Sequence, residues 1–112
     1  MANSKTHSCL PHDDVTTDAV EVFKALASPV RLRMVHALTH EELCVGDIAN
    51  RLQLSMSSTS HQLSILRRLK LVAARDDGRQ TYYRVINKSV AHLVHDCLEH
   101  VDDGKKHRNK RG

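Results

Sequence analysis

The tightest constraint on the fold comes from two short amphipathic segments that follow each other closely in the middle of the chain. Residues 45–52 predict a short helix, Gln53-Leu54 leaves room for only a tight turn, and Ser55 is a suitable N-cap for a second helix. The positions predicted to be buried are Ile48, Ala49 and Leu52, followed by Thr59, Leu63, Leu66 and Leu69. Two helices joined by so short a turn, the second with a polar N-terminal face, predict a helix-turn-helix.

Helices are also predicted on both sides of this motif. A helix near residues 15–27 is followed by Ser28-Pro29, which favours a new helix because Ser caps the first turn and Pro is tolerated within it. That second helix is expected to end near residues 39–40. At the other end of the chain, a last helix is predicted from an apolar stripe formed by Val90, Leu93, Val94, Cys97, Leu98 and Val101.

A β-hairpin is predicted directly after the helix-turn-helix. Residues 71–75 and 80–86 have the composition of strands, and Asp77-Gly78 between them is typical of a hairpin turn. A hairpin in this place is a wing. Residues 13–103 therefore predict one α+β, mostly helical domain: a winged helix-turn-helix of about five helices and a two-stranded wing.

The last helix also predicts a homodimer. It follows the wing and has little left to pack against except the first helix, so part of its apolar stripe is expected to meet a second copy of the chain. A dimer would supply the paired half-sites that helix-turn-helix proteins usually need. The alternative is a last helix packed wholly within its own chain.

The positive charge of the chain is concentrated in its centre. Residues 51–88 carry eight Lys and Arg against two Asp and Glu, whereas residues 1–50 have a balance of −3 and residues 89–103 a balance of −4. A basic segment between acidic ones favours a localised surface for a polyanion such as DNA. The alternative is an ordinary solvated face.

The second helix of the motif and the wing supply the groups that reach DNA. Short hydroxyls approach phosphates closely at a helix N-terminus, longer His and Gln side chains reach base edges, and Arg binds phosphate. On this basis the predicted DNA-binding residues are Ser55, Ser57, Ser58, Ser60, His61, Gln62, Arg67, Arg75 and Arg79. For Ser55 a role in capping alone, and for Ser60 a role in packing alone, are equally consistent with the sequence.

Both ends of the chain are polar. Residues 1–12 predict a flexible arm, and residues 104–112, which carry a balance of +5, predict a disordered basic tail. Neither a signal peptide nor a transmembrane run is visible, and three cysteines without framework spacing argue against a disulfide scaffold. A cytoplasmic protein without membrane association is therefore expected, and its thiols are available for metal or redox chemistry.

Several motifs in this order resemble the ArsR/SmtB family of metal-responsive winged-helix repressors. They are residues 26–33 (LASPVRLR), 42–49 (ELCVGDIA), 60–63 (SHQL) with Leu66, and Gly78-Arg79 followed by Tyr82-Tyr83. The resemblance covers roughly residues 15–103. It implies a dimer that binds a palindromic operator and is released by metal, with the second helix of the motif in the major groove.

The resemblance also implies a metal site. Cys44 and Asp47 lie three residues apart at the start of a predicted helix, and they match the helical ligand pair of such sensors. Cys9 and His12 match the ligands of the N-terminal arm, which would come from the other protomer. Together they would give a tetrahedral set suited to Zn²⁺. Because only two thiolates are present, the thiophilic ions Cd²⁺ and Pb²⁺, and also Co²⁺, rank behind zinc.

A second type of site in this family lies across the last helices of the dimer. His100 and Asp103 match half of that pattern, but Asn87 and Ser89 occupy the positions of the other half and neither is a competent ligand for zinc. We therefore expect this interhelical site to be degenerate.

Two other readings of the function remain open at this stage. One is a repressor of the same fold that senses thiol oxidation through Cys44 or Cys9 with Cys97, although Cys97 is expected to be a buried core residue. The other is a DNA-binding module that is indifferent to metal. An enzyme is not expected, because no nucleophile–base constellation or phosphate-binding glycine loop is visible among only four glycines.

Overall fold

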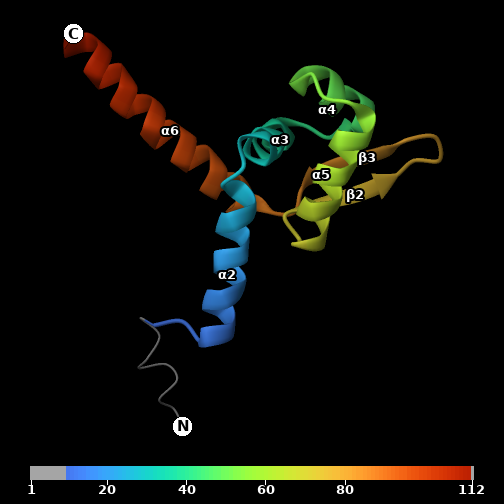
Figure 1. Ribbon diagram of the computed structural model, residues 1–112, viewed down its shortest axis with the longest axis horizontal. Helices are drawn as coiled ribbons and strands as arrows, with labels where there is room; N and C mark the ends of the chain where they lie inside the picture. The colour runs from blue at the N-terminus through green and yellow to red at the C-terminus, as the bar shows by residue number, and fades with distance from the viewer. Residues whose placement is uncertain (1–9, 112) are drawn as a thin grey trace.

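The computed structural model describes residues 10–111, with side chains up to residue 106, and shows a winged helix-turn-helix (Figure 1). Cys9 lies outside the described residues. The helices within this range are α2 (Asp13–Leu26), α3 (Pro29–His40), α4 (Val45–Leu52), α5 (Met56–Arg68) and α6 (Lys88–Arg111). The strands are β1 (Leu43–Cys44), β2 (Val72–Asp76) and β3 (Thr81–Val85).

The predicted helix starts and the tight turn of the helix-turn-helix are confirmed. Ser28 caps α3 by accepting a hydrogen bond from the Arg31 amide at 3.4 Å, with Pro in the first turn. Ser55 caps α5 by accepting from the Ser58 amide at 3.0 Å. Between α4 and α5, Gln53 adopts a left-handed conformation (φ 56°), which ends α4 and allows the chain to turn within three residues.

The sheet has one more strand than the sequence predicted. β1 pairs antiparallel with β3, which pairs antiparallel with β2, giving the order β1-β3-β2. The prediction of a two-stranded wing missed β1 because a strand of two residues leaves no alternating pattern in the sequence. Its pairing of Cys44 with Tyr82 ties the start of α4 to the wing.

The core is aliphatic and lies where α3, α4, α5 and α6 meet the sheet. Its fully buried large side chains are Met34, Val35, Ile48, Leu63, Leu66, Leu71, Val72 and Val94. Thr59 is also buried, and its hydroxyl donates to the Ser55 carbonyl at 2.8 Å, so it has a partner within its own helix. This core holds α5 with its N-terminal polar face outward.

α2 and α6 project away from this core (Figure 1), and both carry exposed apolar side chains. The largest are Val15, Val20 and Phe23 on α2 and Leu93 and Val101 on α6. Cys97 is exposed, so the prediction that it is a core residue is wrong: in a single chain its side of α6 faces an apolar groove beside Phe23 and Leu26 rather than the core.

α6 runs to Arg111 and so includes most of the segment for which the sequence predicted disorder. An i,i+4 ion pair between Asp102 and Lys106 (3.3 Å) supports the helix there, and basic residues near a helix C-terminus are favoured by the helix dipole. None of the helices among residues 10–111 has both the length and the apolar character needed to cross a membrane.

Candidate nucleic-acid interface and metal ligands

The N-terminal half of α5 presents polar side chains to solvent. Ser57, Ser60 and His61 are exposed, and Ser58 is half-buried. The Ser55 hydroxyl accepts the capping hydrogen bond from the Ser58 amide. Ser55 therefore contributes to an anion site by fixing where the helix begins. Met56 lies in the first turn of α5, and its apolar side chain is 56% exposed. Met56 was not among the residues predicted to contact DNA. This end of α5 can meet both phosphates and the apolar edge of a base.

Gln62 is held by Arg31 instead of extending freely into solvent. The Arg31 guanidinium donates from Nη1 to Gln62 Oε1 at 2.9 Å and from Nε to the Ala25 carbonyl at 2.8 Å. Bidentate pairing with adenine needs the amide oxygen of Gln to accept from the base. Because that oxygen already accepts from Arg31, the structure gives Gln62 a role in joining α5 to α3 and to the end of α2.

We expect Arg31→Ala to destabilise the domain and to weaken operator binding, because it removes both bonds at the joint of α2, α3 and α5. Each hydrogen bond from a charged donor contributes about 1.5–3 kcal/mol, so the loss of two should lower the free energy of unfolding by at least that amount. Urea unfolding and operator binding by fluorescence anisotropy measure the two effects. Gln62→Ala, which leaves the bond to Ala25 in place, is the matched control and should cost less stability. Equal losses in the two variants would contradict this assignment.

The two predicted DNA-contacting arginines of the wing differ in their surroundings. Arg79 is exposed in the turn between β2 and β3. Arg75 lies within β2, where its guanidinium binds Glu42 at 2.8 Å and stands 5.1 Å from the centre of the Tyr82 ring. The bond to Glu42 raises the pKa of Arg75 above its usual value. Both arginines were predicted to contact DNA from the tip of the wing, but only Arg79 lies at its tip. Arg75 instead braces the wing against the segment before β1.

The turn of the wing is organised by the Asp77 carboxylate. Its Oδ1 accepts from the amides of Gln80 at 3.1 Å and Arg79 at 3.3 Å, and these bonds lower the pKa of Asp77 below its ordinary value of 3.8. Gly78 occupies a φ of +95°, a conformation that favours glycine. The bonds fix the backbone from which Arg79 extends.

The stabilisation of this turn should be lost on acidification. Since the pKa of Asp77 is lower in the folded protein, the contribution is present above pH 3.8 and disappears as the pH falls through the lowered folded value. We expect the amide resonances of Arg79 and Gln80 to titrate in NMR spectra with a midpoint below 3.8. Asp77→Asn should abolish that titration; a midpoint at or above the ordinary value would contradict the bonding.

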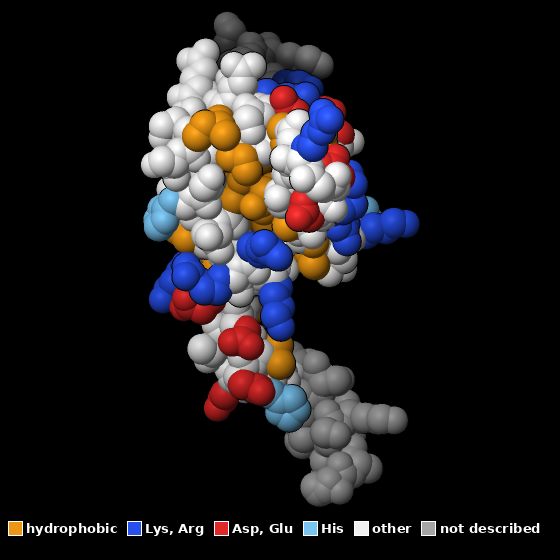
Figure 2. Space-filling view, turned by 90° about the vertical axis from the view of Figure 1, so that its right-hand side faces the viewer, with side chains coloured by type: hydrophobic (Ala, Val, Ile, Leu, Met, Phe, Trp, Pro, Cys, Tyr) orange, Lys and Arg blue, Asp and Glu red, His pale blue; other side chains and the backbone are white. Residues whose placement is uncertain are grey.

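Charge is unevenly distributed over this side of the molecule. Figure 2 shows Lys and Arg side chains over the upper and middle parts of the face that carries the wing, with some acidic side chains among them. At the lower end, where α2 begins with Asp13 and Asp14, the charged side chains are mainly acidic. Arg67, which the sequence predicted to contact DNA, is exposed in the last turn of α5. The basic segment predicted from the sequence thus belongs to the elements that would approach DNA.

The two predicted metal ligands of α4 lie in its first turn. Cys44 is the N-cap residue and is 9% exposed, whereas Asp47, three residues later in the same turn, is exposed. One sulfur and one carboxylate donor at the same helix start fit half of a tetrahedral zinc set. Within residues 10–106, no three His, Cys, Asp or Glu side chains already stand together as a metal site.

The other predicted ligands of this set belong to the arm. His12 is the exposed N-cap of α2. Figure 1 shows the start of α2 far from α4, with α3 between them, so His12 does not approach the start of α4 within one chain.

The residues of the interhelical site lie on α6 and just before it. His100 and Asp103 are both exposed on α6. Asn87 precedes that helix and its Oδ1 accepts from the Val90 amide at 3.0 Å, which is the bond of an N-cap. Asn87 therefore has a structural role at the position where a ligand would be needed.

These features define the chain as a winged helix-turn-helix regulator of the DNA-binding class. A family model described as bacterial regulatory protein, arsR family, matches residues 28–74. A transcriptional repressor SmtB homolog of Synechocystis is 41% identical over 90 residues, covering 80% of this chain and 68% of that protein. The chain belongs to the ArsR family. Its members are transcriptional regulators, which confirms the prediction of a regulator rather than an enzyme.

Two further similarities bear on the site and on assembly. The cadmium resistance transcriptional regulatory protein CadC of Listeria innocua is 45% identical over 73 residues, covering 64% of this chain and 61% of that protein. The solution structure of the homodimeric winged helix-turn-helix DNA-binding domain of Mb0332 from Mycobacterium bovis superimposes with a TM-score of 0.79 at 29% identity. That match covers 87% of this chain and 93% of the other.

Proposed function

We propose that the protein is a cytoplasmic, homodimeric transcriptional repressor that binds operator DNA and is released by a divalent metal ion, with zinc the first candidate. The observation that carries the proposal is the position of Cys44. It starts α4, which packs on the DNA-reading helix α5, and its backbone pairs with Tyr82 of the wing. A ligand bound at Cys44 therefore acts on both elements that would touch DNA.

The dimer is supported by the exposed apolar faces of α2 and α6 and by the homodimeric relative. In the proposed dimer these faces meet, and each arm reaches the other protomer. Cys9 and His12 of one subunit then complete the set begun by Cys44 and Asp47 of its partner. In such a dimer the two copies of α5 would face the two half-sites of a palindromic operator.

Bound metal would supply a fixed link between the arm and α4. Cys44 and Asp47 lie at the start of α4 and would hold the ion there. The Arg75–Glu42 ion pair joins the segment before β1 to the wing, so a shift of this segment would reach the wing. Release requires that the ligand favour a dimer geometry that fits DNA poorly, with a coupling free energy of about 1–3 kcal/mol or more. Zinc leads because the set has two thiolates, one imidazole and one carboxylate. Cadmium, lead and cobalt follow as candidate ions. Cadmium is among them also because one relative is named as a cadmium resistance regulatory protein.

The test is operator binding by the reduced protein, followed by fluorescence anisotropy at fixed salt. Zn²⁺ should weaken binding by about 5- to 150-fold, and a chelator should restore it. Parallel titrations with Cd²⁺, Pb²⁺ and Co²⁺ establish the order of potency. Tight binding that is unchanged by all four ions would overturn the proposal and favour the metal-independent module.

An alternative regulator of the same fold would sense thiol oxidation. Its support is the exposure of Cys97 on α6. Adding an oxidant instead of metal to the same operator complex distinguishes the redox sensor from the metal sensor. The redox sensor is favoured if the oxidant releases the DNA, Cys97→Ser abolishes that release, and metal causes none.

A further inference from the structure

Two histidines on α3 form a close pair that the proposed regulator does not use. His36 and His40 stand one helical turn apart, with their Nε2 atoms 3.4 Å from each other. Their rings are nearly perpendicular, at 83°, with centroids 5.0 Å apart. Both Nε2 atoms therefore point to the same small volume beside the helix.

This separation suits a shared metal ion. Zinc–imidazole bonds are about 2.0–2.1 Å long, so two nitrogens at a tetrahedral angle lie about 3.3–3.4 Å apart. Two His at i and i+4 on a helix are a recurrent zinc-binding arrangement for this reason. Two neutral imidazoles can instead share one proton, but a hydrogen bond at 3.4 Å is long and weak.

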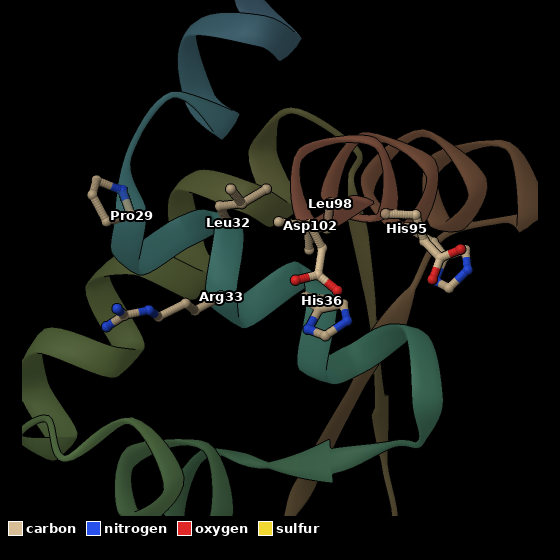
Figure 3. Close-up of a pocket in the computed structure, with 8 residues that line it drawn as sticks. Pro29, Leu32, Arg33, His36, His95, Leu98 and Asp102 are labelled. Carbon is tan, nitrogen blue, oxygen red and sulfur yellow. The ribbon is translucent and has the colours of Figure 1, made fainter. Parts of the chain in front are cut away.

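A third ligand is within reach on α6. The half-buried His36 lines a cavity of about 530 Å³ between α3 and α6, together with His95, Glu99 and Asp102. Figure 3 shows His36 below Asp102, and His95 on the same side of α6. Asp102 forms an exposed ion pair with Lys106 at 3.3 Å. His95 is the donor we choose, because a third imidazole suits the same ions as His36 and His40. The His95 side chain must rotate toward His36 and His40 to complete the site. Within residues 10–106, no three His, Cys, Asp or Glu side chains are already grouped closely enough to hold a metal ion.

We propose that His36 and His40 of α3, closed by His95 of α6, form a second binding site for a divalent transition ion that prefers imidazole, such as Zn²⁺, Ni²⁺ or Co²⁺. Imidazole suits these ions. The site lies within one chain and uses no residue of the Cys44 set, so it does not depend on the proposed function. Its occupation would join α3, which supports the DNA-reading helix, to α6, which carries the exposed apolar face.

The test uses the full chain with all three cysteines replaced by Ser, so that thiolates cannot bind the ion. Zn²⁺ is titrated by calorimetry after circular dichroism has shown a native helix content. We expect one Zn²⁺ per protomer, and His36→Gln with His40→Gln should weaken its binding by at least about 10- to 100-fold. His95→Gln should weaken it less. His92→Gln, an exposed histidine on α6, is the matched control and should leave it unchanged.

Retention of the ion by the His36→Gln, His40→Gln protein, or an equal loss with His92→Gln, would overturn the proposal. If the cysteine-free chain fails to fold, the reduced wild-type protein replaces it: long-range ¹⁵N spectra should show Zn²⁺ shifting the Nε2 resonances of His36 and His40. Unshifted resonances would overturn the proposal. Zinc-dependent operator release should persist in the double His variant and fail in Cys44 variants, so the two proposals can fail separately.

Discussion

Phe23→Glu is expected to convert the dimer into a monomer and to weaken operator binding by about 100-fold or more, equivalent to about 2.7 kcal/mol. Phe23 is 59% exposed on α2 and lines an apolar groove with Leu26 of α2 and Leu93 of α6. In the proposed dimer this groove is covered by the second copy. A carboxylate there must lose its hydration without a partner, which costs several kcal/mol or prevents association.

Analytical ultracentrifugation measures the assembly, and fluorescence anisotropy measures affinity for a full palindrome and for a single half-site. The monomer should bind both DNAs with similar, weak affinity. Lys24→Gln is the matched control, because Lys24 is exposed next to Phe23 and bound to Glu21 at 3.4 Å, away from the groove. A Phe23→Glu protein that still sediments as a dimer would show that another surface joins the subunits.

The parts of the fold that local chemistry determines could be predicted from the sequence. Ser28-Pro29 and Ser55 mark the starts of α3 and α5 because a side-chain cap is encoded within three residues of the helix it begins. The bounds of α4 were predicted from the helical spacing of Ile48, Ala49 and Leu52, since Cys44 makes no side-chain cap. β1 was missed because its pairing with β3 spans about forty residues and involves only two on one side.

The site was predictable in its residue types but not in its contacts. The exposed hydroxyls and His61 of α5 follow from helical spacing alone. Arg31 and Gln62 are 31 residues apart, and no local pattern reveals that one holds the other. Cys97 lies on the apolar stripe of α6, yet spacing alone does not say whether a stripe packs within its own chain or against a second copy.

Cys44→Ser is expected to leave operator binding by the metal-free protein within about twofold of the wild type and to abolish release by zinc. The hydroxyl is smaller than the thiol and is a poor zinc ligand, so the proposed set loses the donor fixed most firmly to the fold. If a hydroxyl at this nearly buried position lowers stability, Cys44→Ala tests the same loss with an apolar side chain. Anisotropy titrations of each variant with Zn²⁺, read against the chelated control, give the remaining coupling.

The pattern of losses among neighbouring variants distinguishes this site from the others on the chain. Asp47→Asn removes a weaker, exposed ligand and should reduce the coupling without abolishing it. His100→Ala, on the pair whose other half is replaced by Asn87 and Ser89, should change release little. Because the wing is joined to Cys44 through the backbone and not through its sulfur, Cys44→Ser should also leave the Arg79 amide resonance unchanged in the metal-free protein. Normal zinc release by Cys44→Ser would show that the proposed ligand set is wrong, and a large loss with His100→Ala would place the regulatory site on α6 instead.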